Sequence, residues 1–346
     1  MVKILKKTGD IAKITMLIVG AVIGAGFASG REIAEMLYSS GAAAYHTVIA
    51  ITLCVAIICI LIMWLGKRIL PKNVSDFHVA IFKKSAPIID IMVLANCFIV
   101  LSAMVAGLSG VAMSIGVVGY VIVPLACVIA VFAVLKKDIS RVIKVNLIIM
   151  PVIIAIIIIV ALPNAIGNGG VLTGRLRLIP SLIYVGMNLI LTVGALIRAY
   201  DIEFKVMIIG AILAGIIIGG LVWVMLAAIS ANPSVAETPM PLFALAMGSG
   251  WLTNALRISM MLSIFTSVVI LLQTIVDWLQ GIIKNRFFAA AIIIVLAFLF
   301  SLIGFTNIVA WFYPIAGVFG IVYLAWLCGY GMIIKAKNNR EMKPTN

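Results

Sequence analysis

Residues 16–37 read MLIVGAVIGAGFASGREIAEML, and the predicted architecture depends on this stretch. It begins like a membrane-spanning helix and then contains four glycines within eleven residues: Gly20, Gly24, Gly26 and Gly30. Glycine destabilises a helix interior by about 1 kcal/mol relative to alanine, so the run predicts that the backbone unwinds there or is closely approached. Within a bilayer, non-helical backbone is tolerated only where protein or a water-filled cavity satisfies its polar groups. A break at this depth therefore predicts a binding site.

The composition indicates that the chain lies in a lipid bilayer. Of its 346 residues, 65% are hydrophobic and 10% are charged, which excludes an ordinary soluble domain. The net charge is +14, but basic and aromatic residues do not interleave in any nucleic-acid-binding pattern, so no nucleic acid is expected. The five cysteines fall in apolar runs, which predicts neither disulfides nor a metal site. His46 and His78 fall in predicted connections, where surface or interfacial histidines are expected.

Ten apolar windows are long enough to cross a hydrocarbon core of about 30 Å. They cover approximately residues 11–38, 43–66, 86–113, 117–135, 142–162, 179–198, 204–230, 252–279, 286–304 and 308–334. We therefore expect an all-α integral membrane protein with ten transmembrane helices, folded as one domain over residues 1–346.

The basic residues predict the orientation of these crossings. If the N-terminus is cytoplasmic, all but four of the 25 Lys and Arg residues lie in cytoplasmic segments. The exceptions are Arg31, Arg175, Arg177 and Arg257. This asymmetry follows the positive-inside rule, and it supports ten crossings with both termini in the cytoplasm.

Ten crossings divide into two sets of five. Because each set has an odd number of crossings, any repeat between residues 11–162 and 179–334 must be inverted. The sixth window is interrupted near its middle by small and polar residues: Gly186, Asn188, Thr192 and Gly194. Paired interruptions in corresponding crossings are typical of transporter sites, so we expect the sixth crossing to be discontinuous like the first.

Two further patterns predict packing around these crossings. Ala211, Gly215 and Gly219 recur at intervals of four, which indicates close helix packing. The apolar run PLFALAMG at 241–248 lies between prolines and polar residues. It is typical either of a small helix covering the outer face or of a plain loop, and both alternatives stay open.

Hydroxyl groups gather in the window 252–279. The spacing of Ser263, Thr266 and Ser267 places them on one helix face. Hydroxyls in membrane helices usually bond to a carbonyl one turn earlier. The alternative is a cage of five oxygen atoms for a hard monovalent cation. The cage would be formed by the hydroxyls of Thr266 and Ser267, the Ser263 carbonyl and the carbonyls freed around Gly20 and Ile23.

The motif GAVIGAGFASGREI at 20–33, with Thr266 and Ser267 in a chain of ten spans, resembles the YkvI-like family of bacterial membrane proteins. That family is similar to the amino acid/polyamine/organocation transporter superfamily, which has the LeuT-type fold. The resemblance covers essentially the whole chain. It implies a 5+5 inverted repeat, discontinuous helices 1 and 6, alternating access, and a multi-pass protein of the bacterial cytoplasmic membrane.

The same resemblance implies that the five oxygens match the sodium site of sodium-coupled members. Some proton-coupled members carry a lysine in span 5 at this site, whereas the window 142–162 has no lysine beyond Lys144 at its cytoplasmic end. A sodium ion is therefore the expected coupling ion. No other cofactor is expected.

Two compatible hypotheses apply to Glu32. Ser29 to Glu32 forms an S-x-x-E capping box, with Ser29 at the N-cap and Glu32 at N3 of the outer half-helix. A charge at this depth is also costly unless it is paired, which indicates a role in binding a substrate amine, a proton or an ion.

The expected substrate pocket lies between the first and sixth crossings. Its candidate residues are Ala25, Gly26, Phe27, Ser29, Gly30 and Glu32 at the break, with Asn96, Tyr184, Asn188 and Ser259 from other spans. For the polar residues of the other spans, an interhelical hydrogen bond is the alternative.

These patterns predict a secondary active transporter of a small amino acid or amine. The alternatives are a receptor of the same fold that binds a small molecule without net transport, resembling spore-germination subunits, and a proton-coupled exchanger. A channel would need a continuous polar stripe or a charged ring, and no span has one. The sequence has no HExxH, no P-loop and no GxSxG with partner residues, so an enzyme is not expected. The oligomeric state is not predicted.

Overall fold

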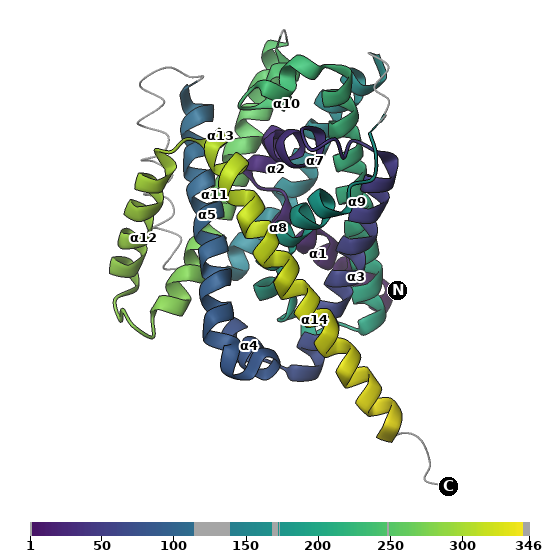
Figure 1. Ribbon diagram of the computed structural model, residues 1–346, viewed down its shortest axis with the longest axis vertical. Helices are drawn as coiled ribbons and strands as arrows, with labels where there is room; N and C mark the ends of the chain where they lie inside the picture. Colours follow the sequence, from purple (N-terminus) through teal and green to yellow (C-terminus); the bar gives the residue numbers. More distant parts are fainter. Residues whose placement is uncertain (1, 114–138, 168–171, 173, 248, 342–346) are drawn as a thin grey trace.

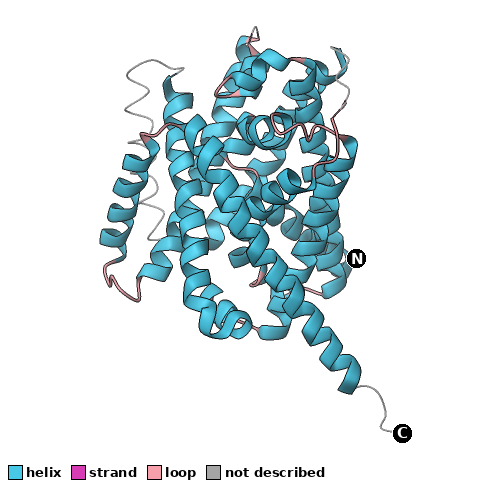
Figure 2. Ribbon diagram, in the orientation of Figure 1, coloured by secondary structure: helices cyan, strands magenta, loops and turns pink. Residues whose placement is uncertain are grey.

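The computed structural model describes the chain except for residues 1, 114–138, 168–171, 173, 248 and 342–346. The described residues form helices joined by loops, with no strand among them (Figure 2). In chain order the elements are α1 (Val2–Val22), α2 (Ala25–Ser29), η1 (Ile33–Tyr38), α3 (Tyr45–Ile69), α4 (Val74–Phe82), η2 (Lys83–Ser85), α5 (Ala86–Met113), α7 (Ile139–Gly167), α8 (Leu178–Leu196), η3 (Ala199–Asp201), α9 (Phe204–Ala231), η4 (Pro233–Glu237), α10 (Pro241–Ala246), α11 (Gly250–Leu279), α12 (Arg286–Ser301), α13 (Phe305–Asn307), η5 (Ile308–Phe312) and α14 (Tyr313–Glu341).

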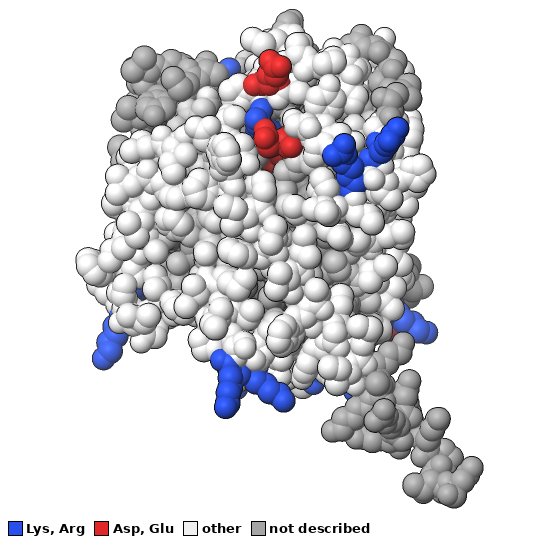
Figure 3. Space-filling model, viewed as in Figure 1, with Lys and Arg blue, Asp and Glu red and all other residues white. Residues whose placement is uncertain are grey.

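Seven helical stretches of the described chain are long and apolar enough to cross a membrane. They are Tyr45–Ile69, Val74–Ala112, Ile148–Gly167, Leu178–Leu196, Phe204–Ala231, Gly250–Leu279 and Phe305–Ile334. On the face in Figure 3, charged side chains lie toward the two ends, and uncharged residues fill the band between them. The chain is therefore an all-helical, multi-pass membrane protein. The predicted window 117–135 lies outside the described residues, and the window 286–304 forms the 16-residue helix α12.

Glycines allow the central helices to touch along their backbones. Helix α14 runs along α8, and α3 runs along α9 (Figure 1). A Cβ atom on Gly320 of α14 would lie 2.1 Å from Gly186 O of α8. A Cβ atom on Gly215 of α9 would lie 2.7 Å from Thr52 O of α3. The close packing predicted from the spacing of small residues in α9 is therefore confirmed.

The predicted break in the sixth crossing is wrong. Helix α8 is continuous from Leu178 to Leu196. Gly186 serves the contact with α14, and the polar side chains bond to carbonyls of their own helix: Asn188 Nδ2 donates to Tyr184 O at 3.0 Å, and Thr192 Oγ1 donates to Leu189 O at 2.7 Å. Small and polar residues here serve helix packing without interrupting the helix.

His78 is not a surface or interfacial residue, contrary to the sequence-based expectation. It is completely buried, and α4 holds it between α5 and α14. Its Nδ1 atom bonds to Asp90 Oδ1 of α5, and its Nε2 atom lies 3.0 Å from the Tyr323 hydroxyl of α14. Asp90 also accepts hydrogen bonds from Ser75 and Trp278. This polar cluster, Ser75, His78, Asp90, Trp278 and Tyr323, connects four helices away from the glycine-rich stretch.

Candidate functional site

The segment predicted to form the first crossing is interrupted between α1 and α2. Ile23 and Gly24 lie outside both helices, and Gly24 is extended, with φ −105° and ψ −168°. In a continuous helix the Gly24 N–H would donate to Gly20 O, four residues earlier. It donates instead to Val22 O at 3.0 Å. The predicted departure from helical geometry is therefore confirmed, and the Gly20 carbonyl loses its usual helical donor.

Close approach explains two glycines of this stretch. A Cβ atom on Gly24 would lie 2.4 Å from Met104 Cε of α5. Gly30, which ends α2 in the left-handed region at φ +81°, would place a Cβ atom 2.7 Å from Leu242 Cδ1 of α10. The break is therefore covered by α5, and the end of α2 is covered by α10.

Glu32 folds back over α2. The residue is 3% exposed, and a Cβ atom on Gly26 would lie 2.1 Å from Glu32 Oε1. The carboxyl group interacts with the backbone N–H of Phe27 and with the side chain of Asn188 in α8. Among the described residues, its Oε2 atom has no hydrogen-bond partner. Gly26 thus makes room for a buried carboxylate beside the break.

The hydrogen bonds predicted for the capping box are not those that form. Ser29 Oγ accepts from the Arg31 N–H at 3.2 Å and donates to Gly26 O at 3.0 Å. The Glu32 carboxyl reaches the Phe27 N–H instead of the Ser29 N–H. Ser29 therefore completes the end of α2, whereas Glu32 is directed toward α8.

Two tyrosines bring further polar atoms to Glu32. Tyr184 of α8 is 1% exposed, and Tyr313, the first residue of α14, is completely buried. Both rings lie close enough to the Glu32 carboxyl to interact with it electrostatically. Neither hydroxyl has a hydrogen-bond partner in the described part of the chain. Tyr184 was predicted as a site residue, whereas Tyr313 was missed, because its only sequence signal is a tyrosine preceding Pro314 within an apolar span.

The break also meets the hydroxyls of α11. Ser263 Oγ donates to Ile23 O at 3.1 Å, and Thr266 Oγ1 donates to Ser263 O at 3.0 Å. Ser263 and Thr266 are buried, and Ser267 is half-buried on the same helix. The structure thus brings Ile23, Ser263 and Thr266 together as predicted. The bond from Thr266 to Ser263 O joins a hydroxyl to a carbonyl of its own helix, which was the alternative to a cation site.

The remaining predicted site residues have separate roles. Phe27 is completely buried beside the break, and Ala25 begins α2. Ser259 Oγ donates to Leu256 O at 2.8 Å, a bond within α11. Asn96 is buried in α5, where neither polar atom of its amide has a partner among the described residues.

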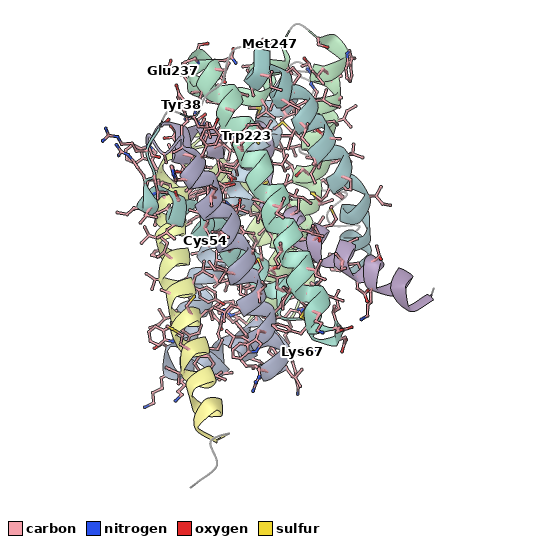
Figure 4. The ribbon with its side chains drawn as sticks, turned by 90° about the vertical axis from the view of Figure 1, so that its right-hand side faces the viewer. Tyr38, Cys54, Lys67, Trp223, Glu237 and Met247 are labelled. Atoms are coloured by element: carbon pink, nitrogen blue, oxygen red, sulfur yellow. The ribbon has the colours of Figure 1, made fainter. Side chains whose placement is uncertain are left out.

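Helix α10 packs on α2, and η4 packs on η1, so η4 and α10 together form a cap over this part of the chain. The apolar run that begins at Pro241 therefore forms a small helix, α10, rather than a plain loop. Arg31 holds this cap, because its Nη1 donates to Ala236 O at 3.0 Å and to Thr238 O at 3.2 Å. Its Nη2 pairs with Glu35. Glu237 of the cap lies at the end of the molecule opposite Lys67 (Figure 4).

Replacing Arg31 with alanine is expected to loosen the cap. Two hydrogen bonds from a charged donor are lost, each of which contributes about 1.5–3 kcal/mol. Amide hydrogen exchange within 234–246 should therefore become at least about tenfold faster. Arg257→Ala on α11, where the Arg257 guanidinium donates to Asn254 of the same helix at 2.6 Å, is the matched control. Equal exchange rates in wild type and Arg31→Ala would contradict this role for Arg31.

Comparison of the chain with models of known protein families and with curated proteins finds no match.

Proposed function

We propose that this chain is a secondary active transporter of a small amino acid or amine that works by alternating access and is coupled to sodium. One observation carries the proposal. The first crossing unwinds at Ile23 and Gly24, beside a buried carboxylate and two buried tyrosines whose polar atoms lack partners. Unwound backbone within a membrane protein is typical of transporter sites, where freed carbonyls bind ions and substrates.

The proposal includes the fold implied by the resemblance to the YkvI-like family: ten crossings, a 5+5 inverted repeat and a LeuT-type architecture. In this proposal, α8 is the sixth crossing and faces the break as one continuous helix, so its side chains bind the substrate in place of exposed backbone. The distribution of basic residues supports cytoplasmic termini in a bacterial cytoplasmic membrane.

Sodium coupling is supported by the oxygens around the break. The Ile23 and Ser263 carbonyls and the Thr266 hydroxyl lie together, and the Gly20 carbonyl lacks its helical donor. Carbonyl and hydroxyl oxygens suit a hard monovalent cation. In this proposal, sodium replaces the bond from Ser263 to Ile23 O, which now joins the break to α11, and the bond from Thr266 to Ser263 O within α11. Ser267 is the fifth ligand, and sodium stabilises one arrangement of the break and α11.

Sodium dependence tests this assignment. We expect sodium chloride to raise the unfolding temperature of the purified protein above that in potassium chloride of equal ionic strength, because an ion that binds only the folded state stabilises it. In Thr266→Ala one ligand is lost, so sodium should bind at least about tenfold more weakly. Ser259→Ala, which removes a hydroxyl bonded within α11, should leave the sodium response unchanged. An equal response in Thr266→Ala and wild type would overturn the sodium site.

Counterflow in proteoliposomes tests transport itself. Vesicles loaded with unlabelled amino acids or amines should accumulate the labelled compound transiently, since a transporter exchanges its substrate across the membrane. Binding of the same compound without counterflow would replace the transporter proposal with the receptor alternative.

A further inference from the structure

Three buried oxygen atoms without partners come from separate elements of the described chain. They are Oε2 of Glu32, after α2, and the hydroxyls of Tyr184 in α8 and Tyr313 in α14. The three residues are 3%, 1% and 0% exposed, and each tyrosine interacts electrostatically with Glu32. Tyr184 lies one turn before Asn188 on α8, and the Asn188 side chain contacts the Glu32 carboxyl, so α8 brings this tyrosine to the same buried region as Glu32.

Many buried hydroxyls in the described residues bond to a carbonyl of their own helix, as in Ser102, Thr192 and Ser259. Other described residues with buried polar atoms that lack partners include Thr47, Asn96, Ser230 and Gln273, but the Glu32 group combines three such atoms with a carboxyl group next to the break. A buried polar atom left without a hydrogen bond costs about 1–3 kcal/mol. Three such atoms beside an unwound backbone indicate a site whose missing partner is a ligand.

The chain itself supplies no positive charge to Glu32 in the described residues. Arg31, the neighbouring residue, is directed away toward the cap and pairs with Glu35. The interactions of the Glu32 carboxyl are with the Phe27 N–H and the Asn188 side chain. An uncompensated carboxylate in the membrane interior is costly, so its partner should carry a positive charge or a proton.

The number of free acceptors narrows the chemistry of that partner. When ionised, the Glu32 carboxylate only accepts hydrogen bonds, and each tyrosine oxygen can accept one while its own proton rotates away. A primary ammonium has three N–H donors and one positive charge. It therefore satisfies all three oxygen atoms and neutralises Glu32, whereas a carboxylate would be repelled.

We propose that the substrate is a compound with a protonated primary amine, whose ammonium binds between Glu32, Tyr184 and Tyr313. This inference rests on the proposed function, because it assigns the substrate class of the same site. The ligand needs no carboxylate, so simple amines bind as well as amino acids. Asn188 acts as a positioning residue that orients the Glu32 carboxyl.

The experiment compares matched ligands by their effect on the unfolding temperature of the full-length protein. Each set contains an amino acid, the amine formed by its decarboxylation and the acid formed by its deamination, with tetramethylammonium as a cation that has no N–H donor. We expect stabilisation by some amino acids and their amines, and none by the acids or by tetramethylammonium. Stabilisation by the acids at least equal to that by the amines would overturn the proposal.

Variants then test the residues. In Glu32→Gln the amine should bind at least about a hundredfold more weakly, because the charge is lost. Tyr184→Phe and Tyr313→Phe should each weaken binding about three- to tenfold, as expected for one hydrogen bond. Glu237→Gln makes the same chemical change at an exposed carboxylate of the cap and should bind the amine like wild type. Unchanged amine binding by Glu32→Gln would overturn the proposal.

Gly26→Ala provides a second test in case Glu32→Gln does not fold. The added Cβ atom would lie 2.1 Å from Glu32 Oε1, at the end of a flexible side chain that can move aside. The carboxylate is then displaced from the tyrosines with its charge unchanged, and amine binding should fall at least about tenfold. Gly220→Ala, at a site with no heavy atom within 4 Å, is the control. Equal amine binding in Gly26→Ala and wild type would overturn the proposal.

Failure of this inference can be distinguished from failure of the proposed function. Counterflow of a compound that lacks an amine would support transport and reject the ammonium site. Amine binding that is lost in Glu32→Gln, without counterflow of any bound amine, would support the ammonium site and reject transport. Stabilisation by low pH alone, lost in Glu32→Gln and unaffected by amines, would assign Glu32 to a proton and reject the ammonium.

Discussion

Replacing Gly320 with alanine is expected to destabilise the protein more than any other glycine substitution in α14. The added Cβ atom would lie 2.1 Å from Gly186 O and 2.2 Å from Gly186 C, both of which are backbone atoms of α8. No side chain can move to relieve the contact, so the two helices must separate along their crossing. Overpacking of this kind costs about 1–3 kcal/mol or more. The free energy of unfolding, measured in mixed detergent micelles, should fall by about 3 kcal/mol.

The control for this variant lies in the same helix. A Cβ atom on Gly329 would meet no heavy atom within 4 Å, and alanine favours helix by about 1 kcal/mol relative to glycine. Gly329→Ala should therefore leave the protein as stable as wild type or slightly more stable. If both variants lose the same stability, the contact between α8 and α14 is not the cause.

Replacing Asp90 with alanine is the second change expected to have a large effect. Asp90 is 7% exposed and accepts hydrogen bonds from His78, Ser75 and Trp278, which come from α4 and α11. Its removal takes the acceptor away from the buried His78 and from the half-buried Ser75 and Trp278. A buried donor left without a partner costs about 1–3 kcal/mol, so the free energy of unfolding should fall by about 3 kcal/mol in all.

The other members of the polar cluster sharpen this test. Asp277→Ala removes a carboxylate that is half exposed and pairs with Arg286, which should cost at most about 1 kcal/mol. Asp90→Asn keeps one acceptor oxygen and should lie between Asp90→Ala and wild type. Asp90→Ala with the stability of Asp277→Ala would mean that the cluster does not hold α4 against α5, α11 and α14.

The interruption between α1 and α2 could be predicted from the sequence because its cause is local. Four glycines in a short stretch remove the helical preference that neighbouring leucines and isoleucines supply, whatever packs nearby. The membrane environment was equally predictable, since 65% hydrophobic residues leave too few polar side chains for a soluble surface. The spacing of Gly215 in α9 also identified a close contact before its partner was known.

The errors came from residues whose roles depend on distant partners. Gly186 and Asn188 look the same in the sequence whether a helix breaks or packs against another, and the answer depends on Gly317 and Gly320 of α14. His78 appeared isolated because Asp90 and Tyr323 reach it only after α5 and α14 pack on α4.

A helical membrane protein with a helix interrupted at its glycines follows from local residue preferences, because hydropathy and helix propensity act between near neighbours. The surroundings of the unwound segment follow from the packing of distant helices. The direction of the Glu32 side chain depends on room at Gly26 and on contacts from α8. The selection of Tyr184 and Tyr313 as its neighbours likewise depends on how α8 and α14 cross. Those contacts join residues far apart in the chain, and no local preference encodes them.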